Sequence, residues 1–173
     1  MRLAEHVVLG GVATAALYPV IGEKCLLFWA ASVLIDVDHY WDFLYRNGFK
    51  DFSVRRMFKF HDSIREMIHR PDFIGLNLFH TLEWLALCYF IGRATGSSYI
   101  QIMLAGMVFH LFLDVLWMIY LRAPFKRAFS IIEYVVRVRR MERQGLSPHH
   151  FYQQVLKKME TQASNLIRAP YKT

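Results

Sequence analysis

Four long apolar segments, separated by turn-forming residues, set the main limits on how this chain can fold. They cover residues 6–21, 25–45, 73–92 and 99–121. Pro19, Gly22, Pro71 and Gly96 mark the turns between them. The segments show no strict alternation of apolar and polar residues and are too long for strands. The sequence therefore predicts an all-α, up-down bundle of about four apolar helices.

One or two amphipathic helices are expected to follow this bundle. Residues 129–143 repeat aliphatic and basic side chains with a helical period, and Ser147-Pro148 has the pattern of a helix start. The chain is accordingly divided into a helical metal-site bundle, residues 1–121, and a basic amphipathic tail, residues 122–173. The hydrophobic content of 55% is that of a folded chain and argues against disorder over the main body.

The length of the apolar segments and the charge of their flanks indicate a membrane protein. Each segment has 16 to 23 residues, close to the length of a transmembrane helix. Arg2, the 46–70 stretch and the tail carry most of the basic residues, whereas the alternate turns hold only Lys24 and Arg93. By the positive-inside rule, we expect an inner-membrane protein with its basic loops and both termini in the cytoplasm. A soluble bundle with unusually apolar helices is the alternative.

The net charge of +7 comes from the tail, which has eleven Lys and Arg against three Asp and Glu, compared with ten against eleven in residues 1–121. A basic tail favours anionic lipid headgroups or nucleic acid, and charge alone does not choose between them. In a membrane setting the expected partners are lipid headgroups and a membrane lipid or small membrane-proximal substrate. Nucleic acid is the less favoured partner.

Carboxylates and imidazoles interrupt the most apolar sequence, where an unpaired charge costs several kcal/mol and needs a compensating partner. In an up-down bundle these residues fall at similar depths, within a few turns of one end. They are His6, Asp36, Asp38, His39, His80, Glu83, His110 and Asp114. A metal ion is the simplest common partner for such a set. Mixed imidazole and carboxylate ligands suit zinc first, with manganese or iron as alternatives.

The spacing of these residues supports ligation. His110 and Asp114 are four residues apart and share a helix face, as do Asp36 and His39 at a spacing of three. Asp38 points elsewhere unless the helix loosens, so it is a candidate for orienting a ligand histidine. Other interpretations remain open: His110 and Asp114 as a neutral hydrogen bond between helices, His6 as a helix-end residue, and Glu83 as the partner of an arginine.

The same residues carry a resemblance to a known family. An early His on an apolar helix, an apolar run ending in Asp-x-Asp-His, a central His and a late His-x-x-x-Asp resemble the bacterial membrane-bound metal-dependent hydrolases. Their ligand pattern is similar to that of zinc-dependent phospholipase C. The matching residues are His6, Asp36, Asp38, His39, His80, His110 and Asp114. This chain departs from the family in having Ile35 where many members have Pro, and only Phe79-His80-Thr81 in the central motif.

The resemblance implies a phosphoesterase-like hydrolase that uses two or more metal ions to activate water. All the matching residues are then candidate ligands, and Asp38 or Glu83 is a bridging ligand or general base. Two other classes of function stay open. His80 and His110 on facing helices are also the ligands expected of a haem-binding bundle, and the polar set is also compatible with a non-catalytic membrane adaptor locked by hydrogen bonds.

Overall fold

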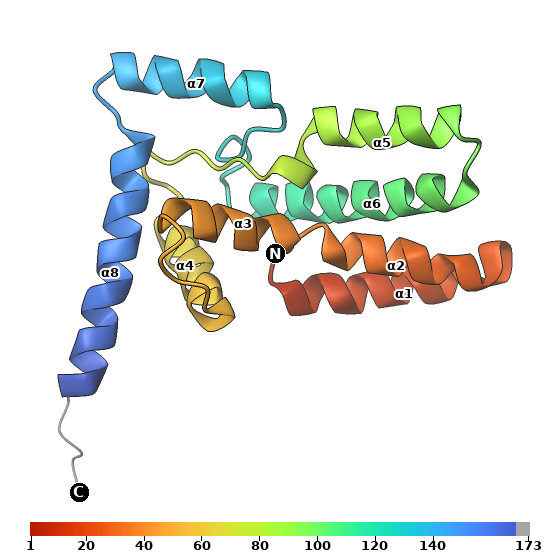
Figure 1. Ribbon diagram of the computed structural model, residues 1–173, viewed down its shortest axis with the longest axis horizontal. Helices are drawn as coiled ribbons and strands as arrows, with labels where there is room; N and C mark the ends of the chain where they lie inside the picture. Colours follow the sequence, from red (N-terminus) through yellow and green to blue (C-terminus); the bar gives the residue numbers. More distant parts are fainter. Residues whose placement is uncertain (169–173) are drawn as a thin grey trace, which may run out of the picture. The chain divides into compact units, whose positions relative to one another are not determined.

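The computed structural model describes the backbone of residues 1–168 and the side chains of residues 1–161 (Figure 1). Within that range the protein contains helices and no strands, which confirms the all-α prediction. The helices are α1 (Leu3–Ile21), η1 (Gly22–Lys24), α2 (Cys25–Leu34), α3 (Val37–Arg46), α4 (Val54–Glu66), η2 (Leu78–His80), α5 (Leu82–Ala94), α6 (Ser98–Tyr120), α7 (Ile131–Arg143) and α8 (Pro148–Arg168).

The chain forms two compact units. Their boundaries differ from the predicted division of the chain after residue 121. The first unit contains Met1–Asp38 and Gly75–Tyr134, whereas the second contains His39–Ile74 and the chain from Val135 onward. Backbone hydrogen bonds explain why residues beyond 121 belong with the first unit. The Gly75 amide donates to the Lys126 carbonyl at 2.8 Å, and the Leu82 amide donates to the Phe129 carbonyl at 2.8 Å.

In the first unit, α2 packs between α1 and α6, and α5 packs along α6 (Figure 1). Glycines lie where these helices approach most closely, as is common in membrane helix pairs. A Cβ on Gly106 of α6 would lie 2.2 Å from the Phe28 carbonyl oxygen of α2. Gly10 of α1 faces the Ser32 side chain of α2 in the same way, at 2.7 Å. Helices α6 and α2 therefore approach at backbone distance, whereas Gly10 makes room on α1 for side chains of α2.

This packing predicts opposite effects for two Gly→Ala substitutions. Gly106→Ala should lower the free energy of unfolding by at least about 2 kcal/mol, because the new methyl group overlaps a backbone carbonyl that cannot rotate away. Gly11→Ala is the matched control, since its Cβ would meet only Trp29 Nε1 at 3.9 Å. The control should be neutral or stabilising by up to about 1 kcal/mol. Unfolding in detergent, followed by circular dichroism, measures both; equal stability of the two variants would contradict the packing.

The second apolar segment, expected as one helix over 25–45, is interrupted in the structure. α2 ends at Leu34 and α3 begins at Val37, so that Ile35 and Asp36 form a turn between them. The third segment also starts later than its apolar pattern indicates. Residues 73–77 are irregular, η2 holds His80, and α5 begins at Leu82 behind the Thr81 cap, whose hydroxyl accepts from the Trp84 amide. Both irregular stretches carry candidate site residues.

The second unit has its own aromatic core, in which α4 packs against α8. Phe60 of α4, Phe43 of α3 and Phe151 of α8 are all buried. Helix α8 begins as predicted, with the Ser147 hydroxyl accepting from the His150 amide and Pro148 as the first helical residue. Arg46 lies over the Tyr152 ring at 3.7 Å, and the Tyr152 hydroxyl donates to the Ile74 carbonyl. This unit folds around its own apolar cluster.

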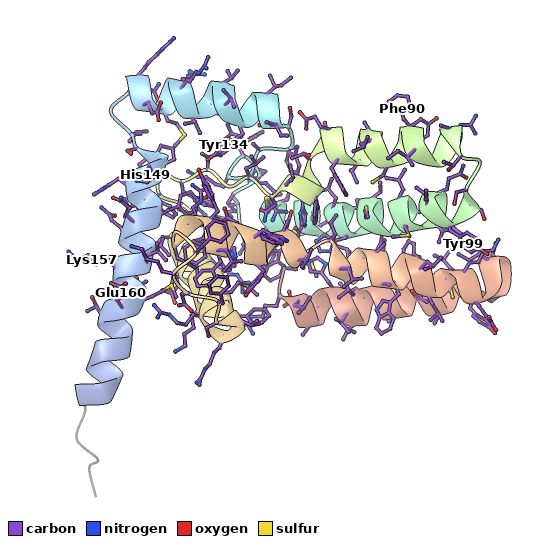
Figure 2. All side chains as sticks on the ribbon, in the orientation of Figure 1. Phe90, Tyr99, Tyr134, His149, Lys157 and Glu160 are labelled. Carbon is purple, nitrogen blue, oxygen red and sulfur yellow. The ribbon has the colours of Figure 1, made fainter. Side chains whose placement is uncertain are left out.

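The helices of the first unit expose large apolar side chains on their outer faces. Helix α6 is long and apolar enough to cross a membrane, and it is the one such helix among the described residues. Phe90 of α5, labelled in Figure 2, points away from α6 and is 66% exposed. Val12 of α1, at 64%, and Phe112 of α6, at 56%, are equally accessible. The interior of this unit, in contrast, holds polar side chains.

Candidate metal centre

Four side chains of the first unit place donor atoms around the Nε2 atoms of His80 and His110. Nε2 of His80 and Nε2 of His110 lie 3.1 Å apart. Asp36 Oδ1 lies 3.5 Å from the first and 3.3 Å from the second of these nitrogens. Asp114 Oδ2 lies 3.8 Å and 3.6 Å from the same two atoms. We call these four residues the donor cluster.

Five of the six separations in the donor cluster, all those that involve an imidazole, are close to the edges of a tetrahedral metal site. Zinc binds His nitrogen and carboxylate oxygen at roughly 2.0 to 2.2 Å, which gives ligand-to-ligand edges of about 3.3 to 3.6 Å in a tetrahedron. The five distances above fall within a few tenths of an ångström of that range. Because these atoms come from three segments of the chain, the turn after α2, η2 and α6, their proximity is a property of the fold. These buried His and Asp groups can hold a metal ion.

Hydrogen bonds behind the two imidazoles engage their Nδ1 atoms and direct their Nε2 atoms toward the donor cluster. Nδ1 of His110 donates to the backbone carbonyl of Ser32 at 2.7 Å. Nδ1 of His80 donates to Asp38 Oδ2 at 3.0 Å. A neutral imidazole that donates from Nδ1 presents a lone pair on Nε2, and such second hydrogen bonds are typical of metal-bound histidines. The two Nε2 atoms lie 3.1 Å apart, so a shared proton or a metal ion must lie between them.

Asp38 holds the segment that carries His80. Besides its bond to the imidazole, Asp38 Oδ2 accepts from the Phe79 amide at 2.9 Å, and Asp38 Oδ1 accepts from Asn77 Nδ2 at 3.4 Å. The turn at Ile35 and Asp36 lets Asp36 and Asp38 both contribute to the same interior, which two residues in one regular helix at this spacing do not. Asp38 therefore has the contacts of an orienting residue.

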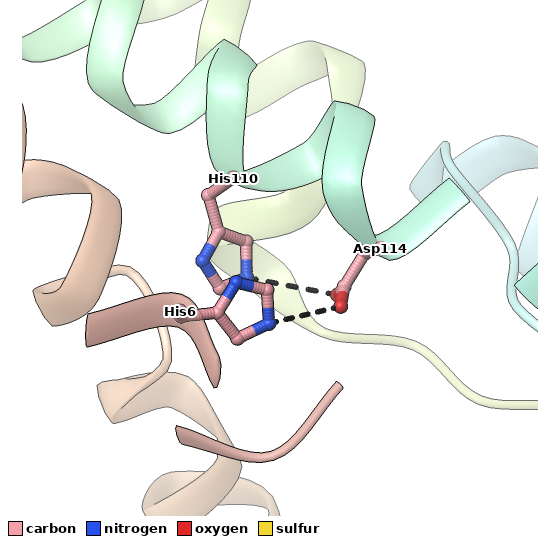
Figure 3. A group of neighbouring side chains, drawn as sticks. All are labelled: His6, His110 and Asp114. Atoms are coloured by element: carbon pink, nitrogen blue, oxygen red, sulfur yellow. Dashed lines mark hydrogen bonds and ion pairs between the residues drawn. The ribbon is translucent and has the colours of Figure 1, made fainter. Parts of the chain in front are cut away.

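A second group of ligand-type side chains surrounds the other oxygen of Asp114 (Figure 3). His6 Nε2 lies 3.2 Å from Asp114 Oδ1, and the His6 ring stacks on the His110 ring at 3.8 Å. The amino group of Met1 lies 2.9 Å from the same oxygen. His6 Nδ1 is buried without a hydrogen-bond partner, which is an unusual state for an imidazole nitrogen. His6, His110 and Asp114 thus form a further candidate for metal binding.

Arg127 is a site residue that sequence reasoning missed. Its Nη1 donates to Asp114 Oδ2, the oxygen that belongs to the donor cluster. Burial acts to lower the pKa of Arg127, but the neighbouring Asp114 carboxylate outweighs it and holds that pKa above its usual value. In the sequence, Arg127 is one of many basic residues beyond residue 121 and has no periodic partner, so no pattern singled it out.

Two predicted site residues have other contacts in the structure. Glu83 Oε1 accepts from the Ser130 hydroxyl and, at 3.0 Å, from the Ile131 amide, so its carboxylate holds the start of α7. His39 belongs to the second unit, where its backbone carbonyl accepts from His61 Nε2 at 2.9 Å and its ring contacts the His61 ring edge-on. The donor cluster of the first unit is formed without either of them.

Comparisons with known proteins add no relative from which a function can be transferred. The chain matches no family in a comparison with known protein families, and comparisons with curated proteins and with solved structures find no similar protein. The function must therefore be argued from the donor cluster and its surroundings.

Proposed function

We propose that this protein is a metal-dependent hydrolase at the membrane, acting on a phosphoester or a similar bond. The proximity of the Asp36 and Asp114 carboxylates to the His80 and His110 Nε2 atoms, at separations suited to zinc, carries this proposal. A zinc or manganese ion held there, or two ions if His6 takes part in a second site, would supply a Lewis acid that makes water nucleophilic near neutral pH.

The residues around such an ion would have different roles. His80, His110 and Asp114 are almost fully buried and hold their donor atoms in place. The Asp36 side chain is the most accessible of the donor cluster, at 18%, so solvent and substrate approach the site on its side. Of the two residues expected as bridging ligand or general base, Asp38 orients His80 and Glu83 binds Ser130. Asp36 is therefore the better candidate to accept a proton.

The membrane part of the proposal rests on the surface of the first unit. Its outer faces are apolar, its helices meet at glycines, and α6 has the length of a membrane span. These properties support a membrane location, and we propose the inner membrane, with the basic stretches in the cytoplasm by the positive-inside rule. The basic residues of α7, Arg137, Arg139, Arg140 and Arg143, suit contact with anionic headgroups. A membrane lipid or another membrane-proximal phosphoester is the matching substrate.

The donor cluster favours a metal ion over haem. Two axial imidazoles of a haem must stand on opposite sides of the porphyrin plane, whereas the two Nε2 atoms here lie only 3.1 Å apart. Carboxylates such as Asp36 and Asp114 also have no role in bis-histidine haem ligation. A non-catalytic adaptor is harder to reconcile with donor atoms gathered around two imidazole nitrogens, since a structural lock needs only paired donors and acceptors.

Hydrolysis by the purified full chain tests the proposal. Protein in detergent, stripped with a chelator and reloaded with zinc or manganese, should cleave bis(4-nitrophenyl) phosphate and a short-chain phospholipid, and the chelator should abolish the activity. Asp36→Asn should lower kcat by at least about 100-fold, as expected for loss of a ligand or proton acceptor. His150→Gln, a change on the exposed surface of α8, is the control. If the fully metal-loaded protein cleaves neither substrate, the proposed hydrolase function is wrong.

A further inference from the structure

We propose that Arg127 is the anion-binding residue of this site and that its ligand is the phosphoryl group of the substrate. This inference rests on the proposed function for its catalytic consequence, although anion binding itself can be measured without turnover. It names the substrate class more narrowly: an ester with a negatively charged phosphoryl group, rather than a neutral carboxylic ester or a peptide.

The loop that carries Arg127 is fixed by backbone hydrogen bonds on both sides of the residue. Helix α6 ends at Tyr120, and Arg122 adopts a left-handed φ of 55° that turns the chain back, with the Ala123 amide donating to the Met118 carbonyl. Arg127 then pairs with Gly75 in an isolated β-bridge. The Ala128 amide donates to the Gly75 carbonyl at 2.9 Å. The guanidinium is thus held on a preorganised backbone, as binding residues need to be.

The position of the guanidinium relative to the donor cluster is the central observation. Arg127 Nη1 bonds to Asp114 Oδ2, and that same oxygen lies 3.6 Å from His110 Nε2. Only 14% of the Arg127 side chain is exposed, so its charge acts at the site and is weakly screened. An anion that contacts the centre of the donor cluster therefore also meets a positive charge at its edge.

The chemistry of arginine indicates which anion fits. A guanidinium is planar, stays charged at all working pH values and presents five N–H donors in a fork that matches phosphate oxygens. Arginine in this position also stabilises the charge that grows on phosphoryl oxygens during displacement. A neutral ester gains neither interaction. The competing explanation is that Arg127 only balances the charge of Asp114, in which case its removal affects stability and metal affinity but not the selectivity for anions.

Binding of inorganic phosphate separates these explanations. Calorimetric titration of the full chain in detergent, with and without bound zinc, should show that Arg127→Met weakens phosphate binding by about 10- to 100-fold, the range for a charge-assisted contact. Arg127→Lys should recover part of the affinity, since it keeps the charge and loses the fork. Arg55→Gln removes an exposed charge from α4, outside the loop that carries Arg127, and should leave phosphate affinity unchanged. Zinc content is measured on each variant so that affinity is compared at equal metal loading.

Kinetics give the second readout. Arg127→Lys should raise KM for bis(4-nitrophenyl) phosphate while leaving hydrolysis of 4-nitrophenyl acetate unchanged. Two substrate arms distinguish the source of the phosphoryl group. If Arg127→Lys raises KM more for the short-chain phospholipid than for the soluble diester, Arg127 binds the phosphoryl group of a lipid headgroup. If KM rises equally for both substrates, Arg127 recognises the phosphoryl group alone. Both results support Arg127 as the ligand of the phosphoryl group.

The inference and the hydrolase proposal can fail separately. Phosphate affinity equal to wild type in zinc-loaded Arg127→Lys, and in Arg127→Met where that variant folds, would overturn the role of Arg127 even if hydrolysis occurs. Conversely, the protein could bind phosphate through Arg127 and yet hydrolyse no substrate. That result would support the anion site and contradict the proposed hydrolase function.

Discussion

His110→Ala should lower zinc affinity by more than about 100-fold, a larger loss than removal of a residue behind a ligand produces. The reason is geometric: His110 Nε2 lies 3.1 to 3.6 Å from the other three donor atoms, so its loss removes the one atom that is close to all of them. Zinc content of the purified protein, followed by competition with a chromophoric chelator, measures the effect.

Two controls keep this result interpretable. His110→Ala also leaves the Ser32 carbonyl without its imidazole donor, so the unfolding midpoint of the metal-free variant must be compared with that of metal-free wild type. His149→Ala removes an exposed histidine of α8 and should leave zinc binding intact. A folded His110→Ala protein that binds one equivalent of zinc with wild-type affinity would show that the ion is held elsewhere.

Asp38→Asn should give the second-largest effect, a 10- to 100-fold loss of zinc affinity that excess zinc overcomes. The substitution keeps the shape of the side chain but replaces the charged acceptor of the His80 Nδ1 proton with an amide. His80 then has a weaker partner for the tautomer that ligation needs. Chelator competition at several zinc concentrations measures both the loss and its recovery.

The shape of the Asp38→Asn titration separates an orienting residue from a ligand. Asp62→Asn, on an exposed carboxylate of α4, is the matched control and should match wild type. If no zinc concentration restores occupancy in Asp38→Asn, the residue ligates the metal directly, as the sequence alone also allowed. An unchanged titration would contradict both roles.

Local patterns in the sequence were enough to predict most helices. α1 and α6 follow from unbroken apolar runs, and α8 follows from Ser147 and Pro148. The turn at Ile35 and Asp36 could not be predicted, because neither residue is a helix breaker. The irregular stretch before α5 was missed for a similar reason: its apolar residues extend the helical pattern, while tertiary hydrogen bonds such as Gly75 to Lys126 fix another conformation.

The sequence was enough to predict most residues of the candidate site, but not the contacts that they make with one another. The cost of burying charge pointed to His6, Asp36, His80, His110 and Asp114, and the structure brings these side chains together. The roles of Asp38 and Arg127 depend on contacts between distant segments. Asp38 reaches His80 across 42 positions, and Arg127 reaches Asp114 through a turn that begins at Arg122. No periodicity encodes such contacts.

X-ray absorption at the zinc edge, on full-length protein loaded with one equivalent of zinc, tests the metal centre most directly. The donor cluster predicts about four nitrogen and oxygen neighbours at roughly 2.0 to 2.1 Å, with the outer-shell scattering of two imidazoles and no sulfur. The imidazole scattering should fall by half in His80→Ala. A spectrum with sulfur neighbours, with no imidazole contribution, or of a protein that retains no zinc at all would contradict the site formed by Asp36, His80, His110 and Asp114.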